Sequence, residues 1–193
     1  MCRILLSWTS EEKFIELIKS IMSANKILLC RVNDLLDLST LDRGTFSTNE
    51  KVFDLLESIN EVISINEQQA LFKENRIGIF EESELPQFVR ADNTRMQQIL
   101  MSYIGNAMKF TSKGQIDVFV KFEKDRTEAN AGLVTIEVRD TGCGISQQDQ
   151  AKLFVPFTML SANKNLNPNG TGMGLSICKR IAESMNGAVW VDS

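Results

Sequence analysis

Two glycine-rich segments constrain the fold of this chain of 193 residues more than any other feature. The first, Asp140-Thr-Gly-Cys-Gly-Ile, directly follows a stretch in which apolar and polar residues alternate. Glycines let a backbone turn sharply and come close to a flat ligand. The carboxylate of Asp140 can then accept a hydrogen bond from an exocyclic amine such as that of adenine. The alternative interpretation is an ordinary strand-to-helix turn.

The second segment, Gly170-Thr-Gly-Met-Gly-Leu, opens an amphipathic helix that we predict for residues 172–185. Backbone N–H groups at a glycine-rich helix start can bind an anion, and the helix dipole strengthens that binding. The segment is not a dinucleotide-binding fingerprint, because no strand directly precedes it, and not a Walker loop, because no Gly-Lys-Ser/Thr follows. The alternative interpretation is a flexible hinge before a helix.

A third group of polar residues lies along a helix predicted from Asp92 or Asn93 to about Phe110. Spacings of three and four put five polar side chains on one side: Arg95, Gln98, Ser102, Asn106 and Lys109. The other side is predicted to face the core through Ile99, Tyr103, Ala107 and Phe110. Such a polar stripe is usually a solvated face. However, Asn106 is unfavourable inside a helix unless its amide is used, and Lys109 lies one turn further on, within reach of an anion.

The rest of the pattern is that of an α+β chain. A broad apolar stripe predicts a long helix from Glu11 to about Arg43, and a second helix begins near Asp54, which forms a capping pair with Glu57. Strands are predicted at 75–81, 87–91, 115–122, 133–139 and 188–192, and alternation of apolar and polar residues supports those at 115–122 and 133–139. We place the first two around a turn, and the third and fourth in a hairpin. Together these elements predict a two-layer sandwich, with helices on one face of a mixed β-sheet, preceded by a long N-terminal helix.

Composition excludes several classes of protein. A net charge of −4 gives no electrostatic basis for binding nucleic acid. No apolar run reaches the length of a membrane span, although a longer parent protein could be membrane-anchored. The four cysteines are scattered without pair spacing, which is typical of reduced thiols in a cytoplasmic protein. The sequence has no histidine, so it contains neither a His-based metal site nor a phosphohistidine.

Four segments, in this order, resemble the motif set of sensor histidine kinases. Asn106-Ala-Met-Lys-Phe-Thr resembles the asparagine box, Asp140-Thr-Gly-Cys-Gly-Ile the first glycine box, Leu153-Phe-Val-Pro-Phe157 the phenylalanine box, and Gly170-Thr-Gly-Met-Gly-Leu the second glycine box. Upstream, Leu35-Leu-Asp-Leu-Ser-Thr-Leu-Asp-Arg-Gly resembles the end of the second helix of the family's dimerisation hairpin. The resemblance covers nearly the whole chain from Glu11. It implies the Bergerat ATP-binding fold, which these kinases share with gyrase B within the GHKL superfamily, for residues 45–193, and part of the dimerisation hairpin for residues 11–44.

The resemblance also implies roles for the matching residues. Asp140 would bind the adenine amine of ATP, Asn106 would coordinate Mg²⁺, and Lys109 would contact phosphate. A lid over the nucleotide would run from residue 158 to residue 169. The other nucleotide-binding residues would be Arg95, Ser102, Gly142, Gly144, Phe157, Gly170, Thr171, Gly172, Gly174 and Leu175.

Three departures from the family pattern keep alternatives open. We expect the helix with the phosphoaccepting histidine, and the last strand of the sheet, to be missing from this chain. Ser102 stands where kinases usually have asparagine and where the related ATPases have a glutamate that activates water. The leading hypothesis is a kinase domain that transfers the γ-phosphate of ATP to a histidine supplied in trans or by a missing segment. It would form a homodimer through its N-terminal helix and act with a histidine-bearing domain and a response regulator receiver domain. The alternatives are a non-catalytic nucleotide-binding or dimerisation module and a gyrase-like ATPase, which Ser102 disfavours because serine is a poor general base at neutral pH.

Overall fold

The computed structural model describes residues 12–43, 45–125, 127–128, 131–158 and 172–193. The chain divides into two compact units, Met1–Thr45 and Phe46–Ser193. The described part of the first unit is one long helix, α2 (Glu12–Asp42), which confirms the helix predicted from the apolar stripe. Many large side chains of that stripe are exposed: Phe14, Leu17, Ile21, Leu28, Leu29, Val32 and Leu36. None of the described helices is both long and apolar enough to span a membrane.

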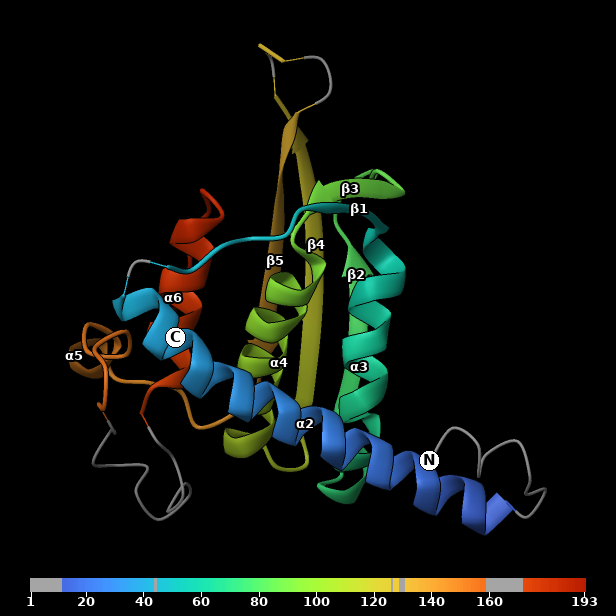
Figure 1. The fold of residues 1–193 in the computed structure, drawn as a ribbon. Coiled ribbons are helices and arrows are strands. Elements are labelled where there is room, and N and C mark those ends of the chain that lie inside the picture. Colours follow the sequence, from blue (N-terminus) through green and yellow to red (C-terminus); the bar gives the residue numbers. More distant parts are fainter. Residues whose placement is uncertain (1–11, 44, 126, 129–130, 159–171) are drawn as a thin grey trace. The chain divides into compact units, whose positions relative to one another are not determined.

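The second unit contains two small sheets (Figure 1). The larger sheet has the order β2-β4-β5 and consists of β2 (Arg76–Glu81), β4 (Gln115–Lys124) and β5 (Gly132–Asp140). Its pairing is mixed, because β2 runs parallel to β4 whereas β4 and β5 form the predicted antiparallel hairpin. The smaller sheet pairs β1 (Lys51–Asp54) antiparallel with β3 (Phe88–Ala91).

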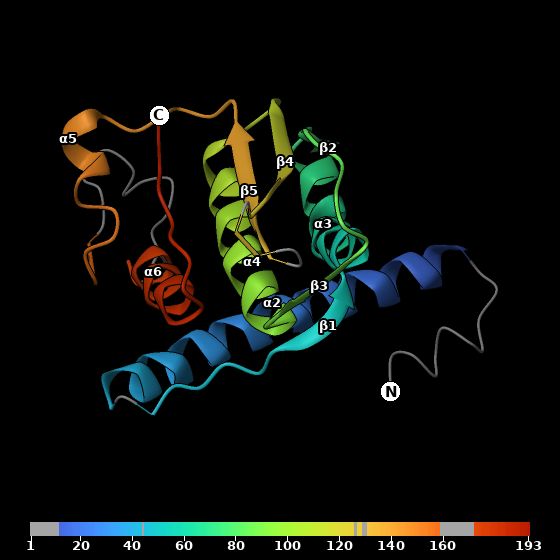
Figure 2. The ribbon, with the colours of Figure 1, turned by 90° about the horizontal axis from the view of Figure 1, so that it is seen from above.

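Three helices form the second layer (Figures 1 and 2). The helices α3 (Leu55–Phe72) and α4 (Asn93–Phe110) cover one face of the larger sheet, and α6 (Gly174–Ser184) packs against α4 on the side away from α3. The alternation of β4 turns Ile116, Val118 and Val120 into the core between the layers, where all three are fully buried. This arrangement confirms the predicted two-layer α+β sandwich.

Polar side chains fix where these helices begin. Asp54 caps α3 by accepting a hydrogen bond from Glu57 N at 2.9 Å, and Asp92 caps α4 by accepting one from Arg95 N at 3.1 Å. Ser146 caps the short helix α5 (Gln147–Gln150). The cap at Asp54 and the start of α4 at Asp92 or Asn93 were predicted from the sequence, because a cap is a contact between residues only three positions apart.

One strand was missed, and two expectations about the fold were wrong. The segments predicted at 75–81 and 87–91 are strands, as expected, and they belong to different sheets, but β1 was not predicted at all. The core face of α4 is turned from the predicted one, because Leu100, Ile104 and Met108 are buried with Ala107, whereas Ile99, Tyr103 and Phe110 are only half-buried. Residues 188–192 form no strand. Instead, Ser193 reaches the α5 region, where its carbonyl accepts from Gln150 Nε2 at 2.8 Å.

Candidate nucleotide-binding site

The Asp140 carboxylate is exposed at the end of β5 and is held from one side. Its Oδ1 atom accepts hydrogen bonds from Gly142 N at 2.8 Å and from Thr111 Oγ1 at 3.3 Å. Among the described residues, no donor bonds to Oδ2. One oxygen is therefore fixed by the protein, and the other is available to a donor from outside.

The glycines of the first segment are required by close packing. A Cβ atom at Gly142 would lie 2.6 Å from Asp140 Oδ1 and 2.7 Å from the carbonyl oxygen of Phe110, so no side chain fits there. Gly144 has a φ of +69°, in the left-handed region that favours glycine. The segment therefore folds back tightly on the end of α4, which is the sharp turn that its glycines predicted.

The polar side of α4 is not a simple solvated face. Gln98 and Ser102 are buried, and Asn106 and Lys109 are half-buried. Arg95 lies over the ring of Phe46 at 4.7 Å and donates to Gln98 Oε1 at 2.8 Å. With a rise of about 1.5 Å per residue, Arg95 is about 21 Å along the helix from Lys109. The structure thus brings Asn106 and Lys109 to the end of α4 near Asp140, and leaves Arg95 at the other end.

Tyr103 on α4 lies close enough to α6 to interact with Cys178. Burial raises the pKa of its phenol, and a coulombic interaction with Cys178 adds to the effect, so the phenol stays neutral at physiological pH. Among the described residues, its buried hydroxyl has no hydrogen-bond partner. We assign it no role at the site.

The second glycine segment leads into α6. This helix begins at Gly174, followed by the half-buried Leu175, and its N-cap residue Met173 makes no side-chain cap. The first backbone N–H groups of α6 thus lack a side-chain acceptor at their cap, which suits an anion. Because α6 packs on α4, this helix start belongs to the same layer as Asn106 and Lys109.

At Gly172, which follows the segment predicted as a lid, the backbone packs closely against the residues where that segment begins. Gly172 has a φ of +67°, and a Cβ atom there would lie 2.8 Å from both the carbonyl carbon of Phe157 and the carbonyl oxygen of Thr158. Phe157 itself has a φ of +62° and is 69% exposed. Gly170, Thr171 and the predicted lid residues 159–169 lie outside the described residues.

The described residues could hold Mg²⁺ only if the phosphates of a bound nucleotide supplied further ligands. The described residues contain no group of three or more histidine, cysteine, aspartate or glutamate side chains that could hold a metal ion. Magnesium in phosphate-binding sites is typically held by few protein groups, together with substrate phosphates and water. The amide oxygen of Asn106 is a suitable ligand of that kind.

Two residues at this site were missed by the sequence reasoning. Thr111 is the last residue of the segment that resembles the asparagine box, and Asn75 is the first residue of a predicted strand, but the sequence indicates no site role for either. Both are almost completely buried, at 1% and 4% exposure. Thr111 donates to Asp140 Oδ1, and Asn75 donates to the carbonyl oxygen of Thr111 at the end of α4. A buried polar side chain needs partners, but neither burial nor partner could be inferred from local pattern.

The fold matches the Bergerat ATP-binding fold of histidine kinase catalytic domains. The family model described as "Histidine kinase-, DNA gyrase B-, and HSP90-like ATPase" matches residues 91–193. The chain belongs to this family, and the relatives below support a histidine kinase ATPase domain of the GHKL superfamily.

Two curated relatives are similar over most of the chain. Two-component system protein A of Emericella nidulans is 36% identical over 169 residues, which are 88% of this chain and 25% of that protein. Hybrid signal transduction histidine kinase B of Dictyostelium discoideum is 33% identical over 185 residues, which are 96% of this chain and 9% of that protein. The chain thus spans a quarter or less of the length of these relatives.

Solved structures agree with the fold. Full-length ShkA in complex with AMPPNP is 27% identical, with a TM-score of 0.69, over 100% of this chain and 38% of that one. The catalytic domain of histidine kinase ThkA is 28% identical, with a TM-score of 0.60, over 74% of this chain and 86% of that one.

Proposed function

We propose that the chain binds Mg-ATP between the end of β5, α4 and the start of α6, and transfers the γ-phosphate to a histidine supplied by another chain or segment. The observation that carries this proposal is the exposed Asp140 carboxylate, which Gly142 N and Thr111 Oγ1 hold from one side. This arrangement leaves Oδ2 to accept the exocyclic amine of adenine. The similar ShkA structure contains AMPPNP, which supports a nucleotide in this position.

The rest of the site supports the phosphate end of the nucleotide. Lys109 in the last turn of α4 would contact one phosphate, and the N–H groups at the start of α6 would donate hydrogen bonds to another. Asn106 would hold Mg²⁺, which neutralises phosphate charge when bound. Phosphoryl transfer depends mainly on positioning and charge stabilisation, and these groups can supply both without a nucleophile of their own.

The acceptor must come from outside the given sequence, which contains no histidine. The matched relatives are much longer and are named as two-component and hybrid signal transduction proteins. We therefore propose a histidine-bearing helical domain as the acceptor and a response regulator receiver domain as the next partner. The exposed apolar stripe of α2 supports self-association through that helix.

Hydrolysis of ATP is the weaker alternative. Ser102 is almost completely buried and cannot act as a general base at neutral pH. A non-catalytic nucleotide-binding module would share the same site without the transfer step.

The test is a transfer assay with γ-labelled ATP and Mg²⁺. The acceptor is the isolated histidine-bearing hairpin of a histidine kinase, and its matched control has that histidine replaced by glutamine. We expect label that is lost in acid and retained in alkali on the first acceptor only. ATP binding without transfer would instead indicate the non-catalytic module, and release of free phosphate without transfer would indicate an ATPase.

A further inference from the structure

We propose that Thr111 and Asn75 are positioning residues for Asp140, and that they set the preference of the site for adenine over bases that lack its exocyclic amine. The inference rests on the proposed function, because it concerns the same nucleotide site. Neither residue needs to touch the nucleotide.

Thr111 is the side chain that holds the carboxylate. It is the C-cap of α4, where its backbone N–H donates to Ala107 O at 2.9 Å, so its backbone is fixed by the helix. Its hydroxyl donates to Asp140 Oδ1, the atom that also accepts from Gly142 N. Two donors on one oxygen restrict rotation of the carboxylate, and the other oxygen then points in a defined direction.

Asn75 in turn holds Thr111. Its side-chain Nδ2 donates to Thr111 O at 3.0 Å, and its Oδ1 accepts from Gly114 N at 3.0 Å. Its own backbone N–H donates to Ala70 O at 2.9 Å. One buried amide therefore joins the end of α3 to both ends of the turn at 111–114, with both side-chain groups hydrogen-bonded.

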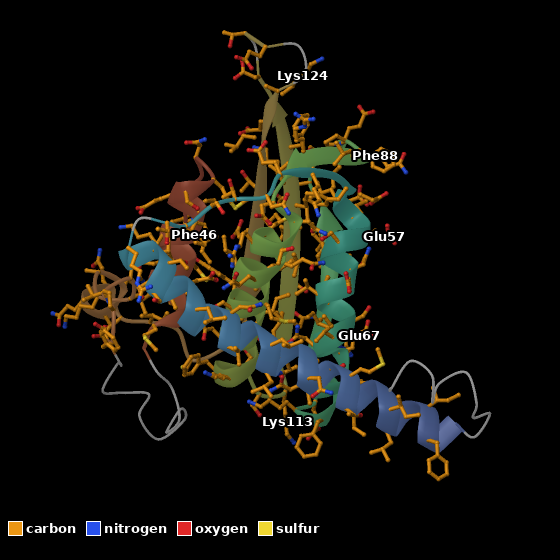
Figure 3. All side chains as sticks on the ribbon, viewed as in Figure 1. Phe46, Glu57, Glu67, Phe88, Lys113 and Lys124 are labelled. Atoms are coloured by element: carbon orange, nitrogen blue, oxygen red, sulfur yellow. The ribbon has the colours of Figure 1, made fainter. Side chains whose placement is uncertain are left out.

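Neighbouring contacts strengthen the same connection. The ammonium group of Lys73, the C-cap residue of α3, donates to Met108 O at 2.7 Å, on the last turn of α4. Arg76 N donates to Gly114 O at 2.9 Å, which begins the parallel pairing of β2 with β4. The turn that carries Thr111 and Lys113, at the lower end of the sandwich in Figure 3, is thereby fixed relative to the sheet on which Asp140 lies.

This geometry has a consequence for the choice of base. A carboxylate oxygen can accept from the amine of adenine, but it repels the carbonyl oxygen that inosine has at the same position. The discrimination depends on the direction of Oδ2, because a freely rotating carboxylate could move away from the carbonyl or find another donor. Loss of the Thr111 hydroxyl should therefore reduce discrimination more than overall affinity.

The experiment measures binding of ATP and of ITP to the full chain by calorimetry, for wild type, Thr111→Val and Thr111→Ser. Valine keeps the shape of threonine without the hydroxyl, and serine keeps the hydroxyl. We expect the ratio of ITP to ATP dissociation constants to fall roughly 3- to 10-fold in Thr111→Val, as for the loss of one ordinary hydrogen bond, and to be retained in Thr111→Ser. The matched control is Thr135→Val on β5, which should keep the wild-type ratio.

The outcomes separate this inference from the proposed function. An unchanged ratio in Thr111→Val, with wild type preferring ATP, overturns the inference and leaves ATP binding intact. An equal loss of affinity for ATP and for ITP also overturns it, since that is what a structural role alone would produce. Wild type that binds neither nucleotide overturns the proposed function and this inference with it.

The role of Asn75 is tested by a double-mutant cycle. If Asn75 acts through Thr111, Asn75→Ala alone should lower the ratio of ITP to ATP dissociation constants. The same substitution should then have little further effect on that ratio in the Thr111→Val chain. Additive effects on the ratio would overturn the role assigned to Asn75. Thermal unfolding of each variant identifies any that fails to fold. If Asn75→Ala does not fold, the comparison of Thr111→Val with Thr111→Ser decides the inference.

Discussion

Replacing Gly142 with alanine should damage nucleotide binding through a single added methyl group. The new Cβ atom would lie 2.6 Å from Asp140 Oδ1 and 2.7 Å from Phe110 O, closer than real Cβ atoms come to other heavy atoms. Phe110 O is a backbone atom at the end of α4, whereas the Asp140 carboxylate can rotate. We therefore expect the carboxylate to move and to lose its hydrogen bond from Gly142 N.

The size of the effect follows from that movement. A misplaced carboxylate loses its bond to the adenine amine, and hydrogen bonds to charged groups contribute about 1.5–3 kcal/mol. This corresponds to a loss of ATP affinity of roughly 10- to 150-fold. Crowding at the turn should also lower the free energy of unfolding by about 1–3 kcal/mol. Calorimetry with Mg-ATP and urea unfolding measure the two effects separately.

Gly105→Ala is the matched control. It introduces the same methyl group into the interior of α4, where no described atom lies within 4 Å of the added Cβ. Alanine is the better helix former, so this variant should be more stable by roughly 0.5–1 kcal/mol and bind ATP as wild type does. Wild-type affinity in Gly142→Ala would refute the tight packing described for the Asp140 turn.

Three further predictions concern the core, the second glycine segment and the long helix. Ile104→Ala, at a fully buried position in the main core, should lower the free energy of unfolding by about 2–5 kcal/mol in urea, and a loss below about 1 kcal/mol would contradict the packing of α4. Gly172→Ala should lower the free energy of unfolding by about 1–2 kcal/mol from its left-handed backbone alone, besides the close contact with Phe157 and Thr158. In the wild type, amide exchange with and without Mg-ATP should show nucleotide-dependent protection of residues 158–169, and equal protection would argue against a lid. In sedimentation, the full chain should form a larger species than a version that starts at Phe46, and identical monomers would refute self-association through α2.

Local patterns predicted most of the elements. The caps at Asp54, Asp92 and Ser146 involve neighbours three residues apart, and the alternation of β4 and β5 is carried by each strand itself. These features need no knowledge of the rest of the chain. The glycines and Asp140 at the candidate site were recognisable for the same reason, because each motif is a short continuous segment.

What could not be predicted depends on contacts between distant residues. The partner of β2 is β4, across β3 and α4 in the chain, so no local pattern could reveal which strands pair. The direction in which α4 faces was set by its packing on the sheet, and five polar residues at helical spacing could not reveal that Gln98 and Ser102 are buried. Asn75 and Thr111 are 36 positions apart, and no local pattern connects them.

The most direct test of the whole account is calorimetric titration of the wild-type chain and of Asp140→Asn with ATP, in the presence and absence of Mg²⁺. Asparagine has nearly the shape of aspartate, but it replaces a charged acceptor by a neutral amide. The account predicts Mg-dependent binding by the wild type and a loss of about 10- to 150-fold in affinity for the variant. Equal binding of Mg-ATP by the two proteins would contradict the assignment of Asp140, and with it the proposed nucleotide site.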